Sequence, residues 1–104
     1  MFDFVKSLFS QAGQVDLAKI IKEGALLVDV RTPQEFADGS VRGAINIPLD
    51  QVNNQSAKFQ GHKNIILFCR SGNRSGQAKS ILEQKGIANV YNGGTWRQVN
   101  ELIG

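Results

Sequence analysis

Cys69 is the only cysteine in the 104-residue chain, and it stands directly before a polar segment that holds two arginines and two glycines. The segment reads Cys-Arg-Ser-Gly-Asn-Arg-Ser-Gly over residues 69–76, and residues with helical spacing follow it. A helix N-terminus and nearby arginines favour a thiolate over a thiol, because both present positive charge to the sulfur. A thiolate is a competent nucleophile at neutral pH. The first chemistry to consider is therefore nucleophilic attack by Cys69.

The segment after Cys69 has the composition of an anion-binding loop. Small residues let successive backbone N–H groups turn toward one centre, and Gly72 is expected to supply the positive φ of a tight turn. Arg70 and Arg74 lie near a helix N-terminus, where positive side chains oppose the helix dipole, and a bound anion would offset that cost. Ser75 has two possible roles, as a hydroxyl donor to the site or as a helix cap. The alternative for Cys69 is a small buried apolar residue beside solvated arginines.

Composition excludes several other classes of site. A single cysteine cannot form an intramolecular disulfide, and with His62 as the only histidine a Cys/His zinc site is not expected. The net charge of +3 comes from scattered residues, 12 basic against 9 acidic, so no nucleic-acid partner is expected. No apolar run reaches the roughly 20 residues that span a bilayer. We therefore expect neither a metal nor an organic cofactor.

Elements that would position Cys69 alternate along the chain. Apolar runs predict strands over residues 25–30, 44–47, 64–69 and 89–91. Helices are expected after Asp16, from the capping box Thr32-Pro-Gln-Glu35, after the Cys69 loop and from Trp96, with an irregular helix near Leu49 and a turn at Gly93-Gly94. This alternation predicts an α/β domain with a central, mostly parallel sheet of about five short strands and helices on both faces. Ligands of such sheets bind at the carboxyl ends of strands, where Cys69 stands.

The first eleven residues form a separate segment in this interpretation. Phe2, Val5 and Phe9 have helical spacing, so residues 1–11 are predicted to be a helical extension of a single domain over residues 12–104. The extension either packs on the domain or docks a partner or membrane surface. The start Met-Phe-Asp-Phe-Val-Lys lacks the pattern of a secretory signal, so a cytoplasmic protein is expected.

Four motifs, in order, resemble those of the single-domain rhodaneses, the thiosulfate sulfurtransferase-like family. The loop from Cys69 to Ser75 resembles the active-site loop of that family, which begins with the catalytic cysteine. Residues 27–36 resemble its Asp-Val-Arg segment, Gly43–Pro48 its next hallmark, and Asn92-Gly-Gly its C-terminal glycine pair. The resemblance covers roughly residues 12–104. Two positions depart from the family pattern, because Ser40 stands where histidine is common and Val99 where tryptophan is usual.

The resemblance implies sulfur transfer through a persulfide on Cys69. An anionic donor such as thiosulfate would give its outer sulfur to Cys69, and cyanide or a thiol, possibly that of a protein, would remove it. The loop residues would bind the donor and stabilise the persulfide charge: Arg70, Ser71, Gly72, Asn73, Arg74 and Ser75. Asp29 and Arg31 are expected to form a structural pair near the strand end, with a direct substrate role as the alternative. A domain of this type can stand alone as a monomer.

Two other functions share parts of this pattern. Cysteine phosphatases and arsenate reductases also place an anion-binding loop between a strand and a helix, but with one residue more between cysteine and arginine than separates Cys69 from Arg74. The shorter loop suits a sulfur atom better than a tetrahedral phosphate. A non-enzymatic alternative is a sulfur carrier or signalling module that binds a partner without turnover.

Overall fold

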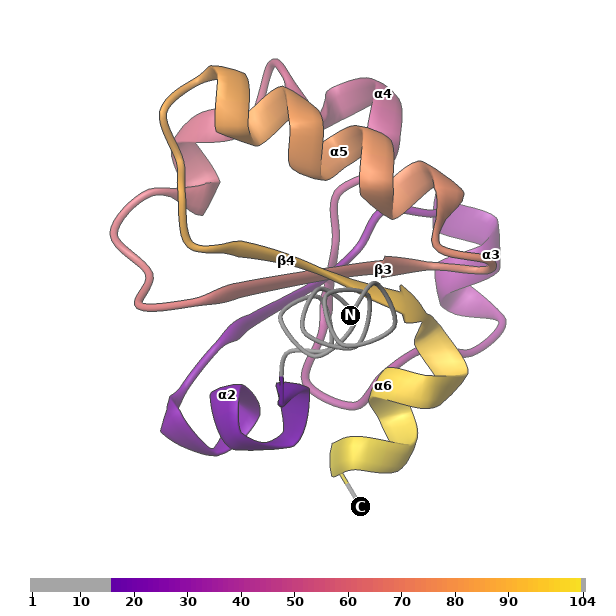
Figure 1. The fold of residues 1–104 in the computed structure, drawn as a ribbon. Coiled ribbons are helices and arrows are strands. Elements are labelled where there is room, and N and C mark those ends of the chain that lie inside the picture. Colours follow the sequence, from indigo (N-terminus) through magenta and orange to yellow (C-terminus); the bar gives the residue numbers. More distant parts are fainter. Residues whose placement is uncertain (1–15, 104) are drawn as a thin grey trace, which may run out of the picture.

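The computed structural model describes residues 16–103 as a parallel sheet covered by helices (Figure 1). The four strands are β1 (Leu26–Asp29), β2 (Ile45–Asn46), β3 (Ile65–Cys69) and β4 (Val90–Thr95). They lie in the order β2-β1-β3-β4, and every neighbouring pair is parallel. The predicted helical extension over residues 1–11 lies outside the described residues.

Helices cover both faces of the sheet, as predicted. In Figure 1, α4 (Leu49–Val52) and α5 (Asn73–Gln84) lie on one side of the strands, while α2 (Leu17–Glu23) and α6 (Trp96–Ile103) lie on the other. A short helix, α3 (Pro33–Ala37), follows β1, and a 3-10 turn, η1 (Ser56–Phe59), precedes β3. The sheet therefore separates two apolar layers.

β3 forms the centre of both layers, and all five of its residues are buried. Ile65, Leu67 and Cys69 pack into the layer beneath α4 and α5, while Ile66 and Phe68 pack into the layer beneath α2 and α6. Adjacent strand residues point to opposite faces, so a strand buried on both faces reads as one continuous apolar run. This alternation turns the side chain of Cys69 toward α5.

The caps that the sequence predicts are present. The carboxylate of Asp16 accepts a hydrogen bond from the amide of Lys19 at the start of α2. Thr32 and Glu35 form a reciprocal capping box at the start of α3, with Pro33 at the first helical position. These caps satisfy amide groups that have no partner within the helix.

Two expectations about strands were wrong. The sheet has four strands within residues 16–103 rather than about five, because only the four apolar runs that the sequence shows form strands there. Gly93 and Gly94 are not a turn but belong to β4, where the register slips so that Phe68 pairs with Gly94. A side chain at Gly93 would approach Val99 and Ile66 to within 3 Å, so helix α6 can pack this closely only over a glycine.

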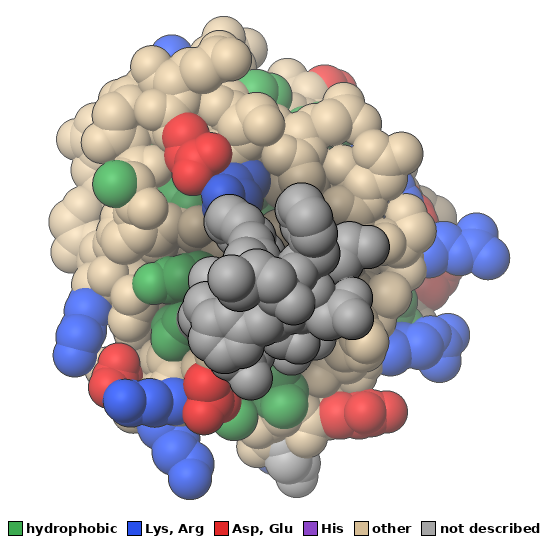
Figure 2. All heavy atoms as spheres, viewed as in Figure 1, with side chains coloured by type: hydrophobic (Ala, Val, Ile, Leu, Met, Phe, Trp, Pro, Cys, Tyr) green, Lys and Arg blue, Asp and Glu red, His purple; other side chains and the backbone are tan. Residues whose placement is uncertain are grey.

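Charged side chains of both signs lie on the surface (Figure 2). On the face in Figure 2, the described basic and acidic side chains are interspersed rather than gathered by sign. Between residues 16 and 103, no helix has the length and apolarity to cross a membrane. The same residues contain no cluster of three or more potential metal ligands among His, Cys, Asp and Glu. The cytoplasmic location stays a prediction.

Candidate active site

Cys69 ends β3 and faces the first turn of α5, the longest helix within residues 16–103. The chain leaves β3 at Cys69 and enters α5 at Asn73, so only three residues form the connection. Gly72, the N-cap of α5, has a φ of +96°. That left-handed conformation favours glycine, as expected from the sequence. The short connection folds the helix N-terminus back over the sulfur.

Donors surround the Cys69 sulfur. The Gly72 amide donates to Sγ at 3.0 Å, and the Ser75 hydroxyl oxygen lies 3.5 Å from Sγ. Of the two roles considered for Ser75, the structure shows contact with the sulfur, since no side chain caps α5. Cys69 and Ser75 are both fully buried.

These contacts shift the acidity of the thiol. Burial raises the pKa of Cys69, because a thiolate loses hydration. Hydrogen bonds from the Ser75 hydroxyl and from the amides of Ser75, Ser71 and Gly72 outweigh burial, so the net pKa lies below that of an ordinary thiol. The sulfur is thus set up to carry negative charge.

Asn92, a residue to which sequence analysis gave no role, ties the loop to β4. Its Oδ1 accepts hydrogen bonds from the Ser75 hydroxyl at 2.7 Å and from the Gly94 amide at 2.9 Å. Its Nδ2 donates to the Gly72 carbonyl at 3.0 Å. The only sequence signal was its place directly before the glycine pair. The side-chain amide of Asn92 therefore contacts two of the residues that touch the sulfur, Gly72 and Ser75.

The two loop arginines have different environments. Arg70 is exposed, whereas Arg74 makes two hydrogen bonds to Glu35, at 2.7 and 3.0 Å. These bonds, together with a hydrogen bond from the Thr32 amide, lower the pKa of Glu35 to about 2. Glu35 and Arg74 both stay charged, so the Arg74 guanidinium beside the loop is already paired with a carboxylate.

The remaining loop side chains point to local partners. The Ser71 hydroxyl accepts from the Asn73 amide at 3.4 Å, and the Asn73 side-chain oxygen accepts from Gln77 at 3.2 Å. Both residues are exposed. They shape the loop and the first turn of α5, and of the two only Ser71 reaches the sulfur, through its backbone amide.

Asp29 and Arg31 form a buried ion pair at the end of β1, with a shortest distance of 2.6 Å. The Asp29 carboxylate also accepts from the Ser40 hydroxyl at 2.7 Å, and Arg31 donates to the Gly39 carbonyl at 2.6 Å. The pair thus fastens the chain after α3 to the sheet. Ser40, which stands where the family commonly has histidine, completes this network.

Trp96 lies against this network. The guanidinium carbons of Arg31 and Arg97 are 4.9 and 4.8 Å from the centre of its indole ring, within cation–π range. The ring packs with the apolar layer of α2 and α6, the face opposite to that of Cys69. His62 is exposed, and its ring Nε2 lies 3.1 Å from the carbonyl oxygen of Lys58, so it is a surface residue.

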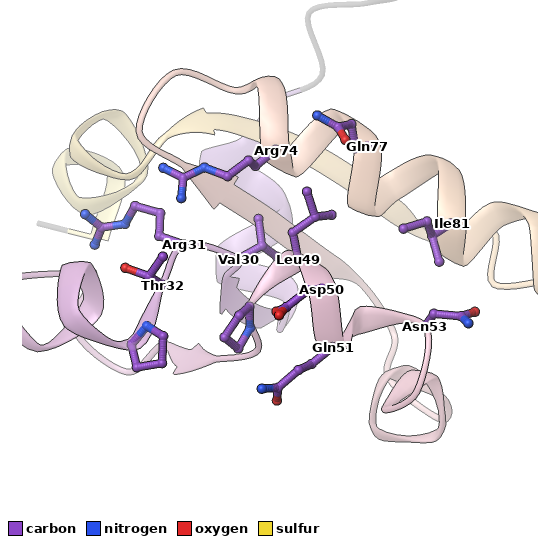
Figure 3. A pocket seen from close by; sticks show the side chains of 12 residues that line it. Val30, Arg31, Thr32, Leu49, Asp50, Gln51, Asn53, Arg74, Gln77 and Ile81 are labelled. Atoms are coloured by element: carbon purple, nitrogen blue, oxygen red, sulfur yellow. The ribbon is translucent and has the colours of Figure 1, made fainter.

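A pocket of about 620 Å³ lies beside the loop (Figure 3). Arg31, Thr32 and Arg74 stand at one end, as Figure 3 shows, and Leu49 and Ile81 contribute apolar walls. Cys69 is not among the lining residues, so the pocket flanks the sulfur rather than containing it. It offers space for a small molecule next to the Arg74 ion pair.

A parallel sheet flanked by helices, with a cysteine at the end of an interior strand and backbone amides turned toward its sulfur, defines the class of α/β domain to which the chain is compared. The profile of the Rhodanese-like domain matches residues 14–95, and the chain belongs to this family.

Relatives and solved structures agree with this assignment. The chain is 39% identical over 74 residues to thiosulfate sulfurtransferase PspE of Escherichia coli, a match that spans 69% of this chain and 71% of that protein. It is 40% identical over 68 residues to the uncharacterized protein YqhL of Bacillus subtilis, spanning 65% of this chain but only 54% of that protein. The structure of a rhodanese with anions from E. coli superposes with a TM-score of 0.66 at 38% identity, covering 72% of this chain and 91% of that one.

Proposed function

We propose that this protein is a thiosulfate sulfurtransferase that works through a persulfide on Cys69. The observation that carries the proposal is the set of hydrogen-bond donors around a single buried sulfur, with the Gly72 amide 3.0 Å from Sγ. Such donors stabilise a thiolate before attack and the terminal persulfide sulfur after it. Relatives named as thiosulfate sulfurtransferases support the donor class.

The first half-reaction loads the sulfur. The Cys69 thiolate attacks the outer sulfur of thiosulfate, a new S–S bond forms, and the S–S bond of thiosulfate breaks. Its electron pair leaves with sulfite, and the persulfide retains one negative charge. Because Cys69 is fully buried, loop residues 70–72 must shift for the donor to reach it. The exposed guanidinium of Arg70 draws the anion toward that opening.

The second half-reaction removes the transferred sulfur from Cys69. Cyanide or a thiolate attacks the outer persulfide sulfur and takes it, and the electron pair of the broken bond restores the Cys69 thiolate. The chain has no second cysteine, so any disulfide formed during turnover joins Cys69 to another molecule. We propose a small thiol or a thiol protein as the acceptor, and the pocket beside Arg74 is large enough for the body of a small thiol.

The test is to incubate the protein with thiosulfate, measure its intact mass, and then add cyanide and measure thiocyanate. We expect the mass of one sulfur atom on wild type and none on Cys69→Ala. Ser80→Ala, on the exposed side of α5, serves as the matched control and should load normally. Absence of both the adduct and thiocyanate in wild type would overturn the proposal.

The same assay separates the alternatives. A sulfur carrier would load Cys69 but make at most one thiocyanate per protein, whereas an enzyme makes many. A cysteine phosphatase would release phosphate from an aryl phosphate and lose this activity in Cys69→Ser.

A further inference from the structure

The orientation of the Asn92 side chain is fixed by its neighbours. The Gly94 amide can only donate and the Gly72 carbonyl can only accept, so the oxygen of the Asn92 amide faces Gly94 and its nitrogen faces Gly72. The oxygen is therefore the atom that meets the Ser75 hydroxyl, at 2.7 Å. Ser75 is the donor of that bond, because an amide oxygen has no proton to give.

Ser75 has one hydroxyl proton and two neighbours that can receive it. When Cys69 is a thiol, its S–H can donate to the Ser75 oxygen, 3.5 Å away, while Ser75 donates to Asn92. A thiolate or a persulfide can only accept, so Ser75 must then turn its proton from Asn92 to the sulfur. The Asn92 oxygen is not left unpaired by this rotation, because it keeps the amide of Gly94.

From this geometry we propose that Asn92 is a positioning residue that holds the Ser75 hydroxyl proton until the sulfur becomes negative and then releases it. Rotation about the C–O bond of Ser75 is the whole movement, and no proton passes between residues. The bond from Asn92 to the Gly72 carbonyl also fixes the residue whose amide faces Sγ. The inference rests on the proposed function, because it concerns the same sulfur.

The charged side chains nearest the sulfur on α5 and β1 are already paired, so a change in the pKa of Cys69 can report the role of Asn92. β4 carries no charged side chain, since its residues are Val, Tyr, Asn, Gly, Gly and Thr. On α5 the nearest cation is Arg74, already paired with Glu35, and on β1 Asp29 is paired with Arg31. Asn92→Asp would keep an acceptor for Ser75 and Gly94 but lose the donor to Gly72. It would also hold the hydroxyl proton more strongly, because a charged acceptor binds it better.

The experiment titrates Cys69 by the pH dependence of its alkylation with iodoacetamide and by thiolate absorbance, on the full chain. We expect the pKa of Cys69 to rise by about one unit in Asn92→Asp, which is about tenfold less thiolate at a pH well below it. Ser75→Ala should also raise this pKa. Asn100→Asp, with the same charge change on an exposed position of α6, should leave the titration unchanged.

The energetic coupling between Asn92 and Ser75 tests whether Asn92 acts on Cys69 through the Ser75 hydroxyl. The shift caused by Asn92→Asp should become smaller in a Ser75→Ala background, because the hydroxyl that transmits it is gone. An equal shift in both backgrounds, or an unchanged pKa in Ser75→Ala, would overturn the inference. The titration uses no sulfur donor, so its outcome is independent of whether thiosulfate loads Cys69. In the sulfur-loading assay, Asn92→Asp should load Cys69 more slowly than wild type at neutral pH, and raising the pH should restore the loading rate.

Discussion

Glu35 binds Arg74 with both carboxylate oxygens while one of those oxygens also accepts from the amide of Thr32. The two residues are separated by 39 positions in the chain, and they join the N-terminus of α3 to the first turn of α5. The charge of the loop arginine is therefore balanced before any donor arrives. Arg70, by contrast, makes no ion pair with any residue that the structure describes.

Replacing Glu35 by glutamine should strengthen the binding of anionic donors. The variant leaves Arg74 without its counter-charge, so we expect the KM for thiosulfate to fall about two- to fivefold, the range of a partly exposed ion pair. The effect should shrink as ionic strength rises. Steady-state kinetics at two salt concentrations measure it. Glu83→Gln, which breaks the surface pair with Lys79, is the control with the same charge change. A KM that stays constant or rises in Glu35→Gln contradicts the prediction.

The same ion pair should make stability sensitive to acid. The pKa of Glu35 is lowered from 4.5 to about 2 in the folded chain, chiefly by Arg74. A carboxylate with a lowered pKa adds stability above its unfolded value, and this contribution is lost as the pH falls through the folded value. Urea unfolding between pH 7 and pH 2 should therefore show a steeper acid loss in wild type than in Glu35→Gln. Parallel curves would show that the pair adds nothing.

Asp29→Asn should destabilise the fold strongly. The substitution leaves the Arg31 guanidinium buried without a counter-charge, and breaking a buried pair costs about 3–5 kcal/mol. The free energy of unfolding in urea measures this cost. The exposed Lys79–Glu83 pair gives the scale for comparison, since Lys79→Met should cost less than about 1 kcal/mol. If Asp29→Asn unfolds like wild type but loses sulfur transfer, the pair has a direct role toward substrate.

Gly93→Ala should destabilise by crowding rather than by backbone strain. The added carbon would lie 2.8 Å from Val99 and 2.9 Å from Ile66, and overpacking of this kind costs about 1–3 kcal/mol. Gly86→Ala is the opposite case, with open space but a φ of +87°. Comparing the two by chemical denaturation separates sterics from conformation. Gly93→Ala should also push α6 away from β4, and unchanged tryptophan fluorescence of Trp96 would argue against this.

Local patterns predicted most elements of this fold because their signals lie within a few residues. The run Ile65–Cys69 and the capping box Thr32–Glu35 are such signals, and both elements formed where expected. Gly93 and Gly94 misled because a glycine pair is typical of turns. Here the reason for glycine is the close approach of α6 to β4, a tertiary contact with no local signal.

The sequence predicts the strand, loop and helix that surround Cys69, but it does not predict which side chains contact the loop. Cys69 and Gly72 could be placed because strand, loop and helix are consecutive in sequence. Asn92 could not, since it meets Ser75 only through the pairing of β3 with β4. The Arg74 charge was assigned to a donor anion, and its pairing with Glu35 depends on how α3 docks on α5.

Cys69 belongs to β3, which, like β1, has a neighbouring strand on each edge and an apolar layer on each face. Amides in such a strand exchange their hydrogens only when the whole domain opens. The Cys69 sulfur therefore lies on an interior strand whose amides we expect to exchange slowly, whereas we expect the exposed residues 70 and 71 to open more readily. A movement of residues 70 and 71 that uncovers Cys69 would then occur far more often than unfolding of the strand that carries it.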